Sequence, residues 1–345
     1  MLRLPTFRYH APKSSSEVAA ILHGEGPAAS VLAGGTDLFP NMKRRQQTPR
    51  TVVSLRNVVD LHRMDGSGGT DVGAAVTLAE VVTRLRSERR GLDALYRAAA
   101  QVATPHLRST ATLGGNICLD TRCSYYDQTY EWRQAIGFCM KREGEVCWVA
   151  PSSRTCLAVS STDCAPALIA HRTEVTLLSV RGERRVALTD LYANDGIAYL
   201  TKQPDELLTA VHIPGASGWR STYWKLRQRG SIDFPVLGVA AALRFAGDDP
   251  TAPLEDARIV LGAVSSRPLV VPTAELLGRP VTDDAIEAIA ERASLQAKPV
   301  DNADFTIVWR KAIVKTFVTG TLRKLRGDPA ETLGLLARKA DAAVS

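Results

Sequence analysis

Two pairs of adjacent glycines, Gly34-Gly35 and Gly114-Gly115, most constrain how this chain can fold. Paired glycines allow positive φ and let bare backbone amides approach a ligand, and a row of amides favours an anion. The alternative is that each pair forms only a tight turn. Neither G-x-G-x-x-G nor G-x-x-x-x-G-K-[ST] occurs, so the common dinucleotide and P-loop folds are poorly supported.

The pattern of apolar residues changes along the chain. Residues 30–33 and 51–55 are typical of short buried strands, and each lies near a helical or turn-rich segment. Thr77 and Glu80 have the spacing of a capping box, which predicts a helix to about residue 88. Beyond residue 170 the pattern predicts a mainly antiparallel sheet, with strands at 174–180, 206–213, 222–227, 236–245 and 257–264. Two helices are expected to close the chain, the first over 304–323.

Composition excludes several classes of protein. The chain has 345 residues, 43 Lys and Arg against 36 Asp and Glu, and 45% hydrophobic residues, which argues against disorder and a coiled coil. The longest nearly uncharged apolar stretch, residues 234–243, is too short for a membrane span, and the first twenty residues show no secretory signal. Basic residues are dispersed and not interleaved with aromatics. We therefore expect a soluble, cytoplasmic protein with no nucleic-acid or membrane partner.

Residues 119–158 follow neither the helical nor the strand period, and a loop of this length inside a domain is functional or disordered. All six cysteines lie in or beside it: Cys118, Cys123, Cys139, Cys147, Cys156 and Cys164. A disulfide framework is unsuited to a large chain without an export signal. Only Cys118 and Cys123 have the close spacing of a zinc knuckle, and no second pair completes such a site.

Four of these cysteines lie inside the irregular segment itself. Thiolates from separated points of a long loop can bind an iron-sulfur cluster, which predicts Cys123, Cys139, Cys147 and Cys156 as ligands. Zinc binding and chance clustering remain the alternatives. Cys118 and Cys164 lie beside other motifs, and we interpret both as small buried hydrophobic residues.

The motifs together resemble the FAD-binding, or medium, subunit of the xanthine dehydrogenase and carbon monoxide dehydrogenase family of molybdenum enzymes. The first glycine pair lies in an A-G-G-T-D loop and the second in a T-x-G-G-N loop. Further matching segments cover nearly the whole chain: Phe7-x-Tyr9-x-x-Pro12, Glu17, Ser161 to Leu168, and Lys225.

This resemblance implies the fold and the FAD contacts. The fold class is α+β, with a two-part FAD-binding domain of the PCMH, or vanillyl-alcohol-oxidase-like, type and an α/β C-terminal domain that has a mainly antiparallel sheet and terminal helices. The implied domains are residues 1–215, which hold the 119–158 insertion, residues 216–330, and a helix or tail at 331–345. The implied cofactor-binding residues are Val31, Leu32, Ala33, Gly34, Gly35, Thr36, Asp37, Leu38, Thr112, Leu113, Gly114, Gly115, Asn116, Asp163, Leu208 and Lys225.

Within the family, the insertion is similar to that of the 4-hydroxybenzoyl-CoA reductase β subunit, and the segment from Leu191 to Ile197 also looks like that branch. The resemblance implies a 4Fe-4S cluster, reduction of 4-hydroxybenzoyl-CoA on a large molybdopterin subunit, a small subunit with two 2Fe-2S clusters, a ferredoxin-type donor and a dimer of heterotrimers. No catalytic residue is expected in this chain. The alternatives are the FAD subunit of another molybdenum hydroxylase and a zinc-stabilised binding or assembly protein.

Overall fold

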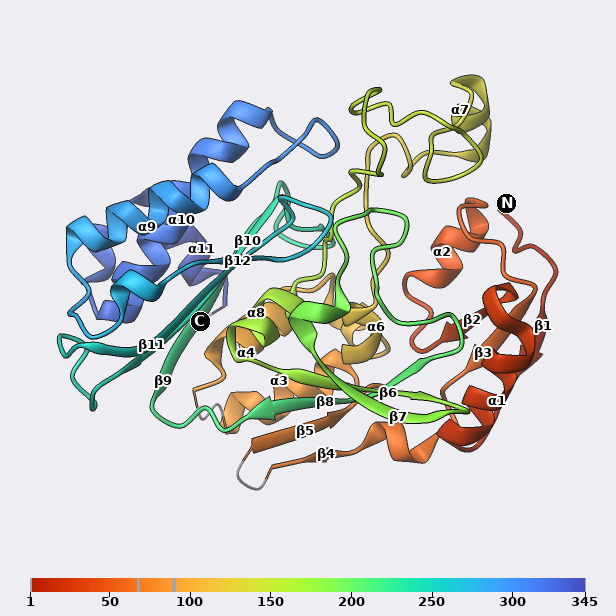
Figure 1. Cartoon of the computed structure of the whole chain (residues 1–345), viewed down its shortest axis with the longest axis horizontal. Helices are drawn as coiled ribbons and strands as arrows, with labels where there is room; N and C mark the ends of the chain where they lie inside the picture. Colours follow the sequence, from red (N-terminus) through yellow and green to blue (C-terminus); the bar gives the residue numbers. More distant parts are fainter. Residues whose placement is uncertain (1, 67–68, 89–90, 345) are drawn as a thin grey trace.

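Three β-sheets follow one another in the computed structural model, which describes residues 2–66, 69–88 and 91–344 (Figure 1). Residue 1, where the predicted first domain begins, and residue 345, where the predicted tail ends, lie outside the described residues. The first sheet is parallel, and the second and third are antiparallel. Within the described ranges, no helix is both long and apolar enough to cross a membrane.

The first sheet has the order β1-β3-β2, with strands Arg8–His10, Thr51–Ser54 and Ala29–Leu32. Every residue of the central strand β3 is buried, as expected where both faces of a parallel strand are covered. Helix α1 (Ser15–Glu25) contributes Val18 and Leu22 to the core that contains Val53. Strand β2 ends at Leu32, so the first glycine pair lies at its carboxyl end, before helix α2 (Leu38–Lys43).

The second sheet has five antiparallel strands in the order β4-β5-β8-β6-β7: Met64–Asp65, Gly69–Gly73, Leu207–Pro214, Glu174–Ser179 and Gly182–Ala187. It shares one core with helices α3 (Leu78–Ser87), α4 (Asp93–Ala100) and α8 (Cys164–Ala170). The predicted capping box is confirmed, because the Glu80 amide donates to Thr77 Oγ1 and the Thr77 amide donates to the Glu80 carboxylate. Short helices α5 (Pro105–Arg108) and α6 (Leu113–Ile117) lead to the inserted segment.

The third sheet confirms the predicted antiparallel C-terminal part. Its order is β12-β11-β10-β9, with strands Leu269–Val271, Leu254–Gly262, Leu237–Phe245 and Trp219–Leu226. The two helices expected to close the chain are present as α10 (Ile307–Arg326) and α11 (Leu335–Ala342), and both pack in its core. Helix α9 (Asp283–Gln296) also packs there and was not predicted, although its Ile286, Ile289 and Ala293 are buried at helical spacing.

Residues 123–158 project from the junction of these parts as a long irregular loop, drawn above the sheets in Figure 1. Backbone hydrogen bonds of 2.8 Å in both directions between Arg122 and Val159 close its base. The predicted irregular segment contains one short helix, α7 (Tyr130–Ala135), which begins after the capping residue Thr129. The insertion is therefore an ordered structure, and it returns to the fold at a defined point.

Candidate functional site

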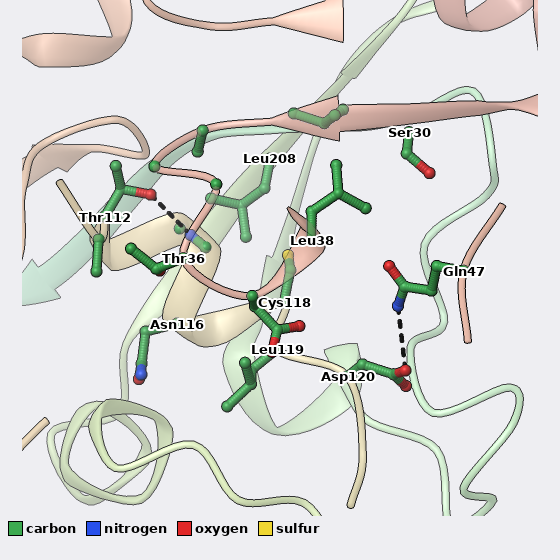
Figure 2. A pocket seen from close by; sticks show the side chains of 18 of the residues that line it. Ser30, Thr36, Leu38, Gln47, Thr112, Asn116, Cys118, Leu119, Asp120 and Leu208 are labelled. Atoms are coloured by element: carbon green, nitrogen blue, oxygen red, sulfur yellow. Dashed lines mark hydrogen bonds between the residues drawn. The ribbon is translucent and has the colours of Figure 1, made fainter. Parts of the chain in front are cut away.

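A cavity of about 1000 Å³ lies at the carboxyl end of β2, and we call it the large cavity. All but three of the sixteen predicted cofactor-binding residues line it, and Figure 2 shows Thr36, Leu38, Thr112, Asn116 and Leu208 around one space. The three exceptions are Leu32, Leu113 and Lys225, which do not line it. Leu32 and Leu113 are buried in apolar cores, because neighbouring residues of a strand or a short helix point in different directions.

The first glycine loop, residues 33–37, presents backbone to the large cavity. Only Gly35 of the two glycine pairs has positive φ, at 69°. Gly34 serves close packing instead, since a β-carbon there would lie 2.0 Å from the Thr110 carbonyl oxygen. Among the described residues, the amides from Gly34 to Asp37 have no acceptor. These free donors fit an anionic cofactor.

The second glycine pair acts differently from the sequence expectation of positive φ and free amides. Gly114 and Gly115 lie within α6 and have negative φ. The Gly115 amide donates to Thr112 Oγ1 at 3.1 Å, and the Gly114 amide donates to the Ala74 carbonyl at 2.9 Å. A β-carbon at Gly114 would lie 2.7 Å from that of Ala74. These glycines let α6 approach its neighbours and leave the cavity wall bare.

Asp163 connects the large cavity to the third sheet. Its carboxylate accepts 2.8 Å hydrogen bonds from the Tyr223 hydroxyl and from Lys225 Nζ. Burial raises the pKa of the Asp163 carboxyl, and the Lys225 ammonium opposes that rise. The Lys225 side chain has no exposed surface and does not line the large cavity, so its predicted contact with the cofactor stays a prediction. Asn116 Oδ1 accepts from Thr162 and from the Cys164 amide, which joins this motif to the second glycine loop.

The insertion adds cavity residues that the sequence reasoning missed. Arg122 forms an ion pair with Asp37 of the first glycine loop and another with Asp127 at 3.1 Å. Its guanidinium lies 4.5 Å from the centre of the Phe234 ring, which also lines the large cavity. Burial raises the pKa of the Asp37 carboxyl, and Arg122 opposes the rise. The A-G-G-T-D loop gave one signal, an acid without an assigned partner, but no pattern linked it to Arg122.

The four cysteines predicted as metal ligands meet inside the insertion. Cys123, Cys139, Cys147 and Cys156 are buried, unpaired by disulfides, and line one small space, which we call the cysteine cavity. Burial raises the pKa of the Cys123 thiol to about 12 and that of Cys156 to about 11. In the described ranges, no three or more His, Cys, Asp or Glu side chains are placed to hold a single metal ion.

Close packing fixes the cysteine cavity against the rest of the fold. A β-carbon at Gly196 would lie 2.7 Å from Cys156 Sγ, so the segment before Ile197 needs glycine there. The Gly196 amide donates to the Cys156 carbonyl at 2.8 Å. On the other side, the buried Arg133 donates to the carbonyls of Arg44 and Arg45. The insertion is thus held to the connection between β7 and β8 and to the residues that follow α2.

The two remaining cysteines lie outside the cysteine cavity. Cys164 is fully buried in the main core at the start of α8, as predicted. Cys118 packs against the same core but is only half-buried and lines the large cavity (Figure 2). The expectation of a buried Cys118 was therefore only partly right, because α6 ends at the cavity wall.

The fold and the large cavity define a protein that binds a nucleotide cofactor. Residues 5–216 match the FAD binding domain in molybdopterin dehydrogenase, and residues 222–325 match the CO dehydrogenase flavoprotein C-terminal domain. The chain therefore belongs to the FAD-binding medium subunits of the xanthine dehydrogenase and carbon monoxide dehydrogenase family, which confirms the predicted family and fold class.

Relatives of this chain act on several substrates. It is 29% identical to the aldehyde oxidoreductase FAD-binding subunit PaoB of Escherichia coli K12, over 79% of this chain and 86% of that protein. It is 27% identical to the nicotinate dehydrogenase FAD-subunit of Eubacterium barkeri, over 95% and 97%. A carbon monoxide dehydrogenase structure from Hydrogenophaga pseudoflava superposes with a TM-score of 0.74 at 23% identity, covering 93% of this chain and 97% of that one.

The large cavity fits FAD on the observations of this structure. Its volume lies at the upper end of the range usual for small-molecule sites, as an extended dinucleotide requires. The free amides from Gly34 to Asp37 suit a pyrophosphate, and the bare wall at Gly115 allows close approach. When bound, FAD supplies one- and two-electron chemistry.

Proposed function

We propose that this chain carries FAD in the large cavity and a 4Fe-4S cluster in the cysteine cavity, and transfers electrons between them as the medium subunit of a heterotrimeric molybdenum enzyme. The observation that carries the cluster is the meeting of Cys123, Cys139, Cys147 and Cys156 around one buried space. A cubane cluster needs four thiolates around a volume larger than a single ion. The domain boundaries near 215 and 330 and the 119–158 insertion belong to this proposal.

The chain's own residues then have defined tasks. The amides from Gly34 to Asp37 hold the pyrophosphate, and Arg122 with Phe234 closes the cavity on the side of the insertion. Backbone amides of Tyr125 and Ala158 point at Cys123 and Cys156, where hydrogen bonds favour the thiolate. The insertion shields the four sulfur atoms from water.

For the substrate we propose 4-hydroxybenzoyl-CoA, on the resemblance of the insertion and of residues 191–197. Its reduction takes two electrons and two protons, and the hydroxyl oxygen leaves as water on the large molybdopterin subunit. A ferredoxin-type protein would donate electrons singly to the cluster, and the small subunit would carry two 2Fe-2S clusters. Two such trimers would form the assembly, and it would work in the cytoplasm.

A second candidate is oxidation of another substrate, with the cluster passing electrons outward. This reading is favoured by the names of the relatives, which include an aldehyde oxidoreductase, a nicotinate dehydrogenase and a nicotine 6-hydroxylase. Assays of the assembled enzyme with 4-hydroxybenzoyl-CoA plus reduced ferredoxin, and with aldehydes plus an artificial acceptor, separate the two candidates.

Substitution of the cysteines tests the cofactor content. We expect Cys123→Ser and Cys156→Ser to purify with FAD but without iron and acid-labile sulfide, since a hydroxyl is a poor iron ligand. The matched controls Cys118→Ala and Cys164→Ala should keep both cofactors. A colourless zinc-containing chain would support the binding-protein alternative, and a yellow chain free of iron would remove the cluster from the proposal.

A further inference from the structure

Two side chains of opposite charge separate the large cavity from the cysteine cavity. Asp120 lines the large cavity and Lys141 lines the cysteine cavity, and neither lines the other space. The Lys141 Nζ atom lies 2.8 Å from Asp120 Oδ1. The side chains are only 5% and 8% exposed, so water screens the pair weakly. The wall between the two cavities therefore contains a buried ion pair, with its negative charge toward the large cavity and its positive charge toward the cysteine cavity.

Several hydrogen bonds fix the orientation of the two side chains. Lys141 Nζ also donates to Thr121 Oγ1 and to the Gly196 carbonyl, each at 2.6 Å. The other carboxylate oxygen of Asp120 accepts from Gln47 Nε2 at 3.1 Å, on the side of the large cavity (Figure 2). Lys141 thus lies on the side of the cysteine cavity, with its ammonium held by three oxygen acceptors, and the Asp120 carboxylate lies on the side of the large cavity.

Two tyrosine rings complete the wall around Lys141. Its Nζ lies 4.9 Å from the centre of the Tyr126 ring, which lines the cysteine cavity. It lies 5.7 Å from the centre of the Tyr199 ring, which lines the large cavity. These rings exclude water from both sides of the ammonium, and their faces favour a cation. Arg122, which pairs with both Asp37 and Asp127, lies nearby at the base of the insertion.

We infer that the Asp120–Lys141 pair sets the difference in reduction potential between the cluster and FAD, an inference that rests on the proposed cluster. One added electron makes a thiolate-bound cluster more negative, and a buried ammonium beside it stabilises that charge. The Asp120 carboxylate disfavours negative charge on a reduced flavin in the large cavity. The pair therefore keeps the cluster easier to reduce and the flavin harder to reduce than either would be without it.

Redox titration of the purified holoprotein with Lys141→Met and Asp120→Asn tests this inference. In titrations with dithionite and mediators, the cluster potential is followed by EPR and the flavin potential by absorbance. Lys141→Met should lower the equilibrium constant for cluster reduction at least tenfold, a shift of about 59 mV for one electron. Asp120→Asn should raise both potentials, because Lys141 keeps its Thr121 and Gly196 acceptors.

Further variants keep the result interpretable. The double variant Asp120→Asn/Lys141→Met should place the cluster potential between those of Lys141→Met and the wild type, and Lys141→Arg should keep the wild-type value. Lys315→Met, in an exposed ion pair with Glu291 on the C-terminal helices, is the charge-matched control and should shift neither potential. If Lys141→Met does not fold, Asp120→Asn still gives a shift of predicted sign.

The two ideas fail in different ways. Absence of iron and sulfide in the wild-type chain, also after anaerobic reconstitution, would overturn the proposed cluster. A cluster that is present but has the same potential in Lys141→Met, Asp120→Asn and wild type would overturn the role of the ion pair and leave the proposed function standing. Shifts in the same direction for the two single variants would also overturn it.

Discussion

Lys225 Nζ lies 2.8 Å from Asp163 Oδ2, with the lysine side chain fully enclosed and the aspartate at the wall of the large cavity. The pair joins the third sheet, through β9, to the residue that precedes α8. Lys225 also donates to the Gln101 carbonyl at 3.2 Å after α4. A side chain whose sequence position suggested cofactor contact thus supports the wall of the cavity from behind.

We predict that Lys225→Met lowers the free energy of unfolding by about 3–5 kcal/mol, because it leaves the buried Asp163 carboxylate without its countercharge. The FAD content of the folded protein should change much less, since Lys225 does not line the cavity. Urea unfolding and the flavin-to-protein ratio measure the two effects. Tyr223→Phe, which removes one hydrogen bond to the same carboxylate, should cost about 1.5–3 kcal/mol. Loss of FAD from stable, folded Lys225→Met would instead show that Lys225 contacts the cofactor.

A second prediction concerns the bare wall at Gly115. Gly115→Leu should abolish FAD retention while the apoprotein stays folded, because a new β-carbon would lie 2.9 Å from Thr112 Oγ1 and 4.0 Å from the Ala33 β-carbon, and we expect the rest of the side chain to enter the large cavity. Flavin absorbance after gel filtration, with circular dichroism for the fold, gives the result. Gly24→Ala, in open space on α1, is the control and should keep FAD. Stoichiometric FAD in Gly115→Leu would place the cofactor elsewhere.

Local signals in the sequence predicted local structure well. Thr77 and Glu80 lie three residues apart, so their capping box needs no information from the rest of the fold. Strand β7 was missed because its sequence, GERRVA, is charged and mostly exposed at the edge of the sheet, where no apolar alternation is needed. The Asp120–Lys141 pair spans 21 residues of irregular chain, and only the folded insertion brings the two side chains together. Tertiary contacts of this kind leave no periodic pattern in the sequence.

The role of Gly196 also could not be predicted from the sequence, because it depends on a tertiary contact. We predict that Gly196→Ala releases the cluster and retains FAD, because the new β-carbon would lie 2.7 Å from Cys156 Sγ and 2.8 Å from both the amide nitrogen and the β-carbon of Ala158. Iron and sulfide analysis beside flavin absorbance measures the two cofactors. Gly230→Ala, which has nothing within 4 Å, should keep both. Full iron content in Gly196→Ala would show that the cysteine cavity tolerates displacement of Cys156.

The last prediction concerns the pH dependence of stability. His171 is buried beside Trp219, with ring centroids 6.2 Å apart, and among the described residues its Nε2 has no hydrogen-bond partner. Burial lowers the pKa of the His171 imidazole to about 4, whereas an unfolded histidine titrates near 6.5. Between these values the unfolded state binds the extra proton, so stability falls as the pH drops from about 6.5 toward 4.

At pH 4.5 the loss from this one group should be about 2–3 kcal/mol relative to pH 7.5. His171→Phe keeps an aromatic ring against Trp219 and removes the titration. The variant should therefore lose less stability than the wild type over the same interval, by that amount, in urea unfolding at the two pH values. All other titrating groups are the same in both proteins. The difference between the two proteins in how much unfolding free energy is lost between the two pH values therefore isolates His171. An equal loss of unfolding free energy in the two proteins would mean that His171 gains its proton in the folded state.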